Sequence, residues 1–155
     1  MVTKSIKEGE NYTHDKNVML RYAQNYAKKN GTKSLKSDDI EDILTVIIAI
    51  GQALLSKNPR AVARALVELG HLIKKYGAPL VSKLYHNFRQ RQRRRAQAGE
   101  KVNVPPTEQR LQKFLAEHSA VADQRAHLTV QQLFGAKKGI RGTRFVIKNR
   151  ERSVA

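Results

Sequence analysis

The spacing of apolar residues between positions 37 and 88 constrains the fold more than any other feature of this chain. These residues recur every three or four positions, which is the period of an α-helix that buries one face. Asn58-Pro59 interrupts the pattern with an N-cap residue followed by a proline suited to the first helical position, and Gly77 interrupts it again. The sequence therefore predicts helices over residues 37–55, 59–77 and 79–99. Short joints between them favour an antiparallel bundle or a stack of helical hairpins.

Local signals extend this pattern toward the N-terminus. A further helix is predicted from His14 to the stop signal Asn30-Gly31. Ser37 is predicted to cap the next helix, because the acidic residues that follow it suit the positive end of a helix dipole. The inner face of the first helix is expected to carry Val18, Met19, Tyr22 and Tyr26.

The chain is expected to divide near the Pro105-Pro106 pair. We predict a flexible arm over residues 1–13, a helical bundle over 14–99, a linker over 100–106 and a small basic region over 107–155 with a flexible tail. Thr107 and Thr129 are expected to cap helices in that last region. The predicted fold is all-α, with a bundle of about four helices and a basic, partly helical C-terminal extension.

The charge balance indicates a polyanionic partner. Thirty Lys and Arg residues against thirteen Asp and Glu give a formal net charge of +17, and self-repulsion of this size is usually offset by a partner of opposite charge. Nucleic acid is the favoured partner, and an anionic membrane surface contacted by residues 43–55 is an alternative. That apolar stretch is too short to span a membrane, and the N-terminus lacks the apolar segment of a secretory signal. The expected location is cytoplasmic or nucleic-acid-associated, or nuclear in a eukaryotic host.

The strongest functional signal is the stretch RQRQRRR at positions 89–95, after which no acidic residue occurs before Glu100. Apolar residues at helical spacing precede it and are expected to anchor its helix to the bundle: Leu80, Val81, Leu84, Tyr85 and Phe88. Arginine forks bind phosphate and guanine edges, and bulged RNA grooves accept arginine-rich helices. We therefore predict nucleic-acid binding, with RNA favoured over DNA. The predicted contacts are Arg89, Arg91, Arg93, Arg94 and Arg95.

A second basic surface is predicted near the C-terminus, and the sequence is compatible with more than one structure for it. Its residues are Lys137, Lys138, Arg141, Arg144 and Lys148. One interpretation is a DNA-binding regulator with a helix-turn-helix whose turn lies at Gly139-Ile140. A short strand over residues 143–148 and a flexible basic tail are the alternatives. A further hypothesis is a structural protein that packages a genome through bulk charge.

No pattern of catalytic or metal-binding residues emerges from the sequence. The five histidines are scattered, cysteine is absent, and no glycine-rich phosphate loop occurs. We therefore expect no enzymatic activity, no cofactor and no metal. The aromatic residues are mostly expected in the core, and the strongly apolar helices over 37–77 favour a homo-oligomer, since one small bundle would leave apolar surface exposed.

Overall fold

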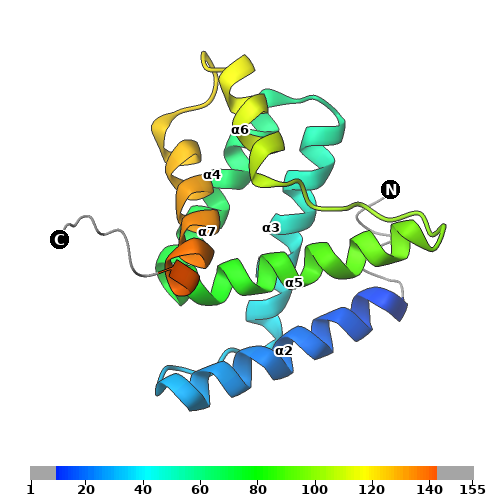
Figure 1. The fold of residues 1–155 in the computed structure, drawn as a ribbon, viewed down its shortest axis with the longest axis vertical. Coiled ribbons are helices and arrows are strands. Elements are labelled where there is room, and N and C mark those ends of the chain that lie inside the picture. The colour runs from blue at the N-terminus through cyan, green and yellow to red at the C-terminus, as the bar shows by residue number, and fades with distance from the viewer. Residues whose placement is uncertain (1–9, 143–155) are drawn as a thin grey trace.

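The computed structural model describes the backbone of residues 10–142 and, within them, the side chains of residues 12–135 (Figure 1). These residues form helices and no strand, which confirms the all-α prediction. The helices are α2 (Glu10–Asn30), α3 (Ser37–Leu55), α4 (Pro59–Tyr76), α5 (Ala78–Gln97), α6 (Glu108–Glu117) and α7 (Gln124–Gly142).

Most helix ends coincide with local signals in the sequence. Asn58 caps α4 by accepting a hydrogen bond from the backbone N–H of Ala61 at 3.2 Å, and Thr107 caps α6 in the same way. The prediction for Ser37 was wrong by one residue, because Lys36 is the N-cap and its N–H donates to the side chain of Asp39 at 2.8 Å. Asp39 thus holds the first turn of α3 through its carboxylate.

The first helix differs from its prediction in start and in orientation. It begins at Glu10, four residues before the expected His14, and its buried face is rotated from the predicted one, although Met19 belongs to both and Tyr26 packs against the core. That face consists of Tyr12, Asp15, Met19, Ala23 and Ala27. Tyr22, expected inside, is 36% exposed. The small side chains of Ala23 and Ala27 let α2 pack closely against its neighbours. Because Asp15 interrupts the apolar pattern, this buried face is hard to recognise in the sequence.

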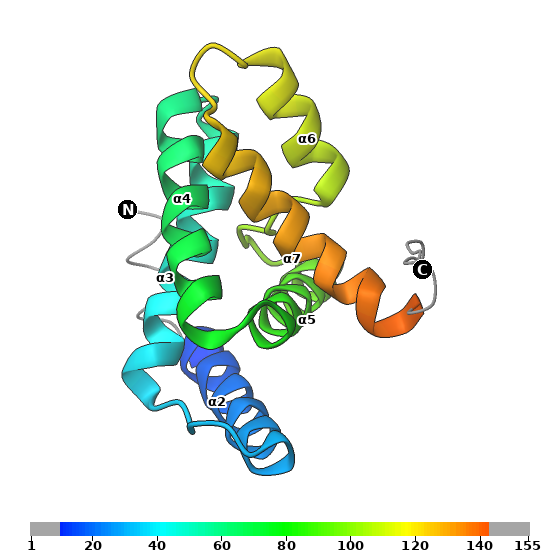
Figure 2. The same ribbon diagram turned by 90° about the vertical axis from the view of Figure 1, so that its left-hand side faces the viewer.

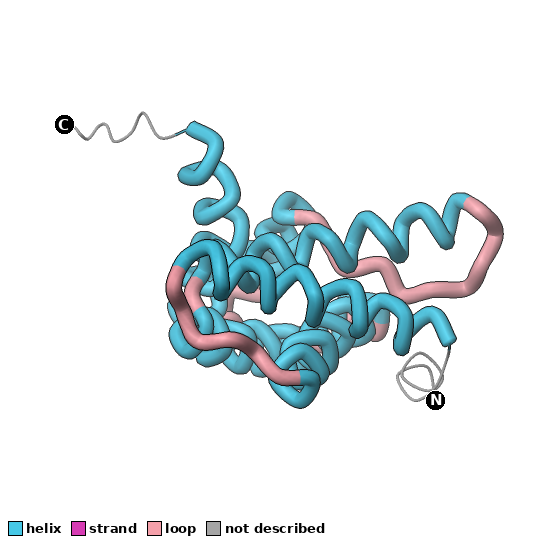
Figure 3. The backbone as a smooth tube through the Cα atoms, turned by 90° about the horizontal axis from the view of Figure 1, so that it is seen from below, coloured by secondary structure: helices cyan, strands magenta, loops and turns pink. Residues whose placement is uncertain are grey.

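Helices α3 and α4 form an antiparallel pair at the back of the molecule, and α5 runs across its front (Figures 1 and 2). Helix α2 lies beside α5 in the opposite direction, and it crosses nearest the viewer when the molecule is seen from below (Figure 3). Helix α7 packs between α4 and α5, and α6 lies against α7. The outward face of α5 is therefore flanked by α2 along its length and by the end of α7.

One contiguous core includes residues from all six described helices. The segment 100–106 does not form an open linker between two cores, since Asn103, Pro105 and Pro106 are buried. The hydroxyl of Tyr85 in α5 donates to the carbonyl of Pro106 at 2.6 Å. The C-terminal helices therefore complete the bundle, because α4 and α5 bury an apolar face against them.

The apolar helices that favoured a homo-oligomer are covered within one chain. Helix α3 buries its five isoleucines almost completely, and α4 buries Val62, Leu66 and Leu69. Among the described side chains, large exposed apolar groups are dispersed over α2, α3, the α6–α7 connection and α7. The homo-oligomer stays a prediction with no face assigned to it.

Candidate nucleic-acid interface

Helix α5 is packed in its first half and charged in its second. The five predicted anchors, from Leu80 to Phe88, are all buried, as expected. Burial of Tyr85 and Phe88 means that these rings contribute to packing and are not free to stack on bases. Tyr85 lies edge-on to Phe134 of α7, with ring centroids 5.7 Å apart. The helix that carries the arginines is therefore fixed to the core at its start.

The five predicted arginines occupy different environments along the second half of α5. Arg93 and Arg94 are exposed to solvent, whereas Arg89, Arg91 and Arg95 are half-buried. The Nε atom of Arg89 is buried without a hydrogen-bond partner among the described residues. The structure thus separates two fully available arginines from three that the fold partly encloses.

A buried aspartate in α2 accounts for two of the enclosed arginines. Asp15 is fully buried. Its carboxylate accepts a hydrogen bond from each terminal nitrogen of the Arg95 guanidinium, and Nη2 lies 2.8 Å from Oδ1. The hydrogen bond to Asp15 raises the pKa of Arg95 above its ordinary value. Arg91 lies 3.5 Å from the same carboxylate, and buried Gln92 donates to it at 3.3 Å. Asp15 therefore holds the charged end of α5 against α2.

The outward face of α5 is a continuous stripe of basic and amide side chains. Its exposed members are Lys83, Gln90, Arg94 and Gln97, with Arg93 on the adjacent flank. Lys83 and Arg94 are eleven positions apart, which is about 16 Å along a helix axis. Arginine and lysine bind phosphates, and the glutamine amides both donate and accept hydrogen bonds. We call this set the α5 stripe.

The second predicted basic surface is described only in part. Lys137, Lys138 and Arg141 belong to α7, but their side chains lie outside the described residues, as do Arg144 and Lys148 altogether. The end of α7 emerges beside the start of α5, on the side of the outward face (Figures 1 and 2). The described backbone of α7 therefore ends on the same side of the molecule as the outward face of α5.

The helix-turn-helix prediction was wrong where the structure describes it. Helix α7 runs without a break through Gly135 and Gly139 to Gly142, so the expected turn at Gly139-Ile140 is absent. Thr129 is not a cap: it lies inside α7 and donates to the carbonyl of Arg125 at 3.0 Å. Asp123 holds the first turn instead, accepting from the N–H of Ala126. The proposed recognition segment and the alternative strand over 143–148 lie outside the described residues.

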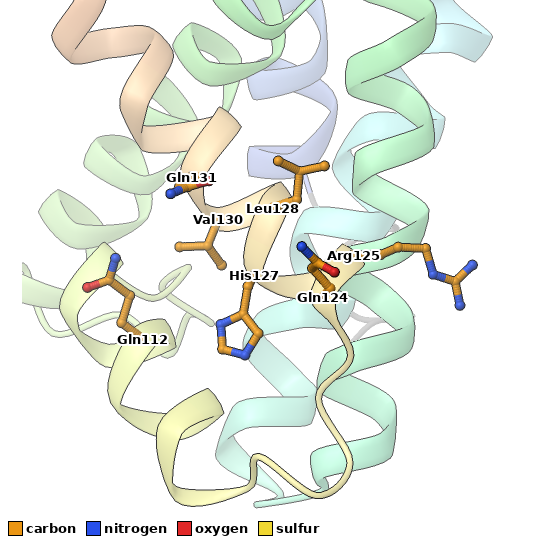
Figure 4. A pocket seen from close by; sticks show the side chains of 7 residues that line it. All are labelled: Gln112, Gln124, Arg125, His127, Leu128, Val130 and Gln131. Atoms are coloured by element: carbon orange, nitrogen blue, oxygen red, sulfur yellow. The ribbon is translucent and has the colours of Figure 1, made fainter. Parts of the chain in front are cut away.

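Two surface grooves accompany these helices. One, of about 540 Å³, lies between α2 and the start of α5. The other, of about 490 Å³, lies between α6 and α7. Figure 4 shows that Gln112 and His127 face the space between these two helices, whereas Arg125 extends to the opposite side of α7. The side chains around the second groove do not converge on one point. The first groove, by contrast, adjoins the α5 stripe through Lys83.

The described residues contain no group of three or more histidine, aspartate or glutamate side chains placed to hold a metal ion. None of the helices in residues 10–142 has the length and apolar character needed to cross a membrane. Comparison of the chain with protein-family models, with curated proteins and with solved structures gave no match.

The sequence indicates the cluster of arginines but not the role of Asp15 or the groove beside Lys83. An acidic residue inside an apolar stripe looks like a solvent-facing position. The groove depends on two helices that are distant in the sequence. A usable signal was the pair of alanines, Ala23 and Ala27, which continue a helical stripe from Met19 and show the inner face of α2.

Proposed function

We propose that this chain is a non-enzymatic nucleic-acid-binding protein that contacts its partner through the α5 stripe, with RNA favoured over DNA. The observation that carries the proposal is the exposure of Arg93 and Arg94 on a helix whose other side is fixed by Asp15 and the core. A rigid helix lowers the entropy lost when charged side chains are ordered on a ligand. Counterion release from phosphates supplies the affinity.

The position of α5 in the fold favours RNA. Helix α5 is enclosed on part of its circumference, because α2 runs beside it and α7 packs against it near its start. Insertion into the major groove of regular DNA is the usual mode for a recognition helix, and it requires a helix that protrudes. Irregular RNA offers bulges and loops that a one-sided, partly recessed surface can follow. The single-sided exposure also means that the helix contributes one face, not its whole circumference.

The test compares two double variants that remove the same charge. Arg93→Ala/Arg94→Ala changes the α5 stripe, and Arg60→Ala/Arg64→Ala changes exposed arginines on α4, at the back of the molecule. Binding to a bulged RNA hairpin and to a DNA duplex is measured by fluorescence anisotropy from low to high salt. Neutralisation of about six phosphates predicts a slope of roughly −5 for log affinity against log salt.

We expect the α5 variant to weaken RNA binding and to reduce the steepness of that slope by about 2. The α4 variant should bind nearly as well as the unchanged protein. Equal losses in the two variants would favour a packaging protein that acts through bulk charge. Binding that does not depend on salt would contradict the proposal altogether.

A further inference from the structure

The groove between α2 and α5 is lined by two helical faces. Helix α2 contributes Tyr22, Asn25, Tyr26, Lys29 and Asn30, which recur at helical spacing, and α5 contributes Pro79 and Lys83. The volume of about 540 Å³ is within the range of pockets that hold small organic groups. None of these lining residues is acidic. The groove is therefore a mixed aromatic, amide and basic surface without negative charge.

Tyr22 is the feature that distinguishes this groove from the rest of the surface. Among the tyrosine and phenylalanine side chains that the structure describes, it is the most exposed, at 36%. Tyr12, Tyr85, Phe88, Phe114 and Phe134 are buried in the core. Partial burial and the neighbouring Tyr26 raise the pKa of Tyr22 above its ordinary value, so its hydroxyl stays neutral. An exposed neutral ring offers a face on which a planar group can stack.

The charged and amide groups around Tyr22 complement a nucleotide. Lys29 of α2 and Lys83 of α5 are both exposed and lie on opposite walls of the groove. The amide nitrogen of Asn30 donates to the carbonyl of Tyr26 at 2.9 Å, and the amide also carries an oxygen that can accept hydrogen bonds. Ammonium groups bind phosphates, and asparagine amides form hydrogen bonds with base edges.

The groove is continuous with the α5 stripe, because Lys83 belongs to both. A ligand that occupies the groove and extends along α5 would reach Arg94 about 16 Å from Lys83. A fully paired duplex cannot place a base against Tyr22, since its bases are stacked inside the helix. Unpaired bases in loops and bulges are free to stack on aromatic side chains.

We propose that this groove binds an unpaired nucleotide of the partner RNA, with its base stacked on Tyr22 and its flanking phosphates held by Lys29 and Lys83. The inference rests on the proposed function, because the rest of the RNA is held by the α5 stripe. It adds a preference: the protein distinguishes RNA with an unpaired nucleotide from a fully paired duplex.

The experiment uses the full chain and two RNA duplexes that differ by one bulged nucleotide, a 2-aminopurine. Three substitutions are compared with the unchanged protein: Tyr22→Ala, Tyr22→Phe and, as a control on the exposed surface of α7, Leu128→Ala. Affinities for the two duplexes and the fluorescence of 2-aminopurine, which falls when the base stacks, are measured for each. Thermal unfolding shows that each variant is folded, and Tyr22 is exposed enough for its replacement to leave the fold intact.

We expect the unchanged protein and Tyr22→Phe to prefer the bulged duplex and to quench its fluorescence. Tyr22→Ala should lose about fivefold to a hundredfold in affinity for the bulged duplex, the range for removal of one base–aromatic stack, and should abolish quenching. The affinity of Tyr22→Ala for the paired duplex should equal that of the unchanged protein. Leu128→Ala should match the unchanged protein in both affinities and in quenching. Equal affinities of Tyr22→Ala and Tyr22→Phe for the bulged duplex would overturn the inference.

The Arg93→Ala/Arg94→Ala variant separates this inference from the proposed function. If both hold, the variant binds the two duplexes more weakly by the same factor and keeps the preference for the bulge. If Arg93 and Arg94 matter while Tyr22 does not, the groove assignment fails and the proposed function stands. If Arg93 and Arg94 have no effect on either RNA, the proposed function itself fails.

Discussion

Asp15 of α2 and Arg95 of α5 are eighty positions apart in the sequence, and two hydrogen bonds join the carboxylate of one to the guanidinium of the other. The carboxylate has no exposure to solvent, and the Arg95 side chain keeps only 15%. The negative charge of Asp15 offsets part of the repulsion among the arginines of α5. The pair therefore holds this arginine-rich end of the helix in a fixed position. The exposed neighbours Arg93 and Arg94 are thereby presented on an ordered helix end.

Replacement of Asp15 by asparagine should destabilise the protein. Removal of one partner from a buried pair typically costs 3–5 kcal/mol, and we expect about 3 kcal/mol here, since Arg91 and Arg95 retain some access to water. Urea unfolding measures the loss. Glu41→Gln is the matched control: it breaks a partly exposed pair with Lys16, 3.3 Å long, and should cost less than about 1 kcal/mol. Similar losses in both variants would show that burial of Asp15 contributes little.

Arg95→Lys tests whether the fork geometry matters beyond charge. Lysine keeps the positive charge but cannot donate two parallel hydrogen bonds to one carboxylate. We expect a loss of about 1.5 kcal/mol in the free energy of unfolding, the lower range for a hydrogen bond to a charged group. Arg94→Lys changes an exposed residue of the same helix and should alter stability by less than about 0.5 kcal/mol. If Arg95→Lys had the same free energy of unfolding as the unchanged protein, charge alone would hold α2 and α5 together.

The helices were predictable because their ends depend on local chemistry. Asn58 and Thr107 cap through their own side chains, and the apolar period identifies the buried face of α3 and α4. The orientation of α2 was not predictable in the same way. Its inner face contains alanines and one aspartate, and the aspartate is tolerated there only because Arg95 and Gln92 arrive from α5.

The sequence indicates where the candidate site lies but not the different environments of its arginines. Residue order shows that α5 carries a dense positive charge, yet it cannot show that Arg91 and Arg95 face α2 while Arg93 and Arg94 face solvent. Tyr22 illustrates the same difficulty. Tyr22 would be buried if α2 packed through the predicted face, and it is exposed because the adjacent face packs instead. Which face is buried depends on how α2 meets α3 and α5.

Gly70 should be intolerant of a side chain, because α4 and α7 meet there. A methyl group at Gly70 would lie 2.6 Å from the hydroxyl oxygen of Thr129. Gly70→Ala is therefore expected to cost about 1–3 kcal/mol through overpacking, measured by urea unfolding. A second substitution, Thr129→Ala, removes the clashing oxygen and should restore most of the loss.

Gly135→Ala is the matched control for the same substitution in a helix. A methyl group at this position meets nothing within 4 Å, and the residue is exposed. Alanine loses less conformational freedom than glycine when a helix forms, so we expect a gain of about 0.5–1 kcal/mol. A loss at Gly135 would contradict the continuous course of α7 through this residue.

Asp39 should make the stability of the chain sensitive to acid. The backbone N–H of Lys36, followed by the hydroxyl of Tyr76 at 2.6 Å, lowers the pKa of Asp39 below its ordinary value of 3.8. A carboxyl group with a depressed pKa in the folded state stabilises that state fully above its unfolded pKa, near 4. This contribution is lost as pH falls through the lower, folded pKa.

Asp39→Asn should therefore be destabilising at pH 7, and its difference from the unchanged protein should shrink as the pH falls from about 4 to 2. Tyr76→Phe removes one hydrogen bond and keeps the one from Lys36, so it should cost only about 1 kcal/mol at pH 7. Asp38→Asn, at an exposed neighbour, should cost less than Asp39→Asn at pH 7. Urea unfolding at a series of pH values makes the comparison. A constant gap between Asp39→Asn and the unchanged protein down to pH 2 would contradict the depressed pKa of Asp39.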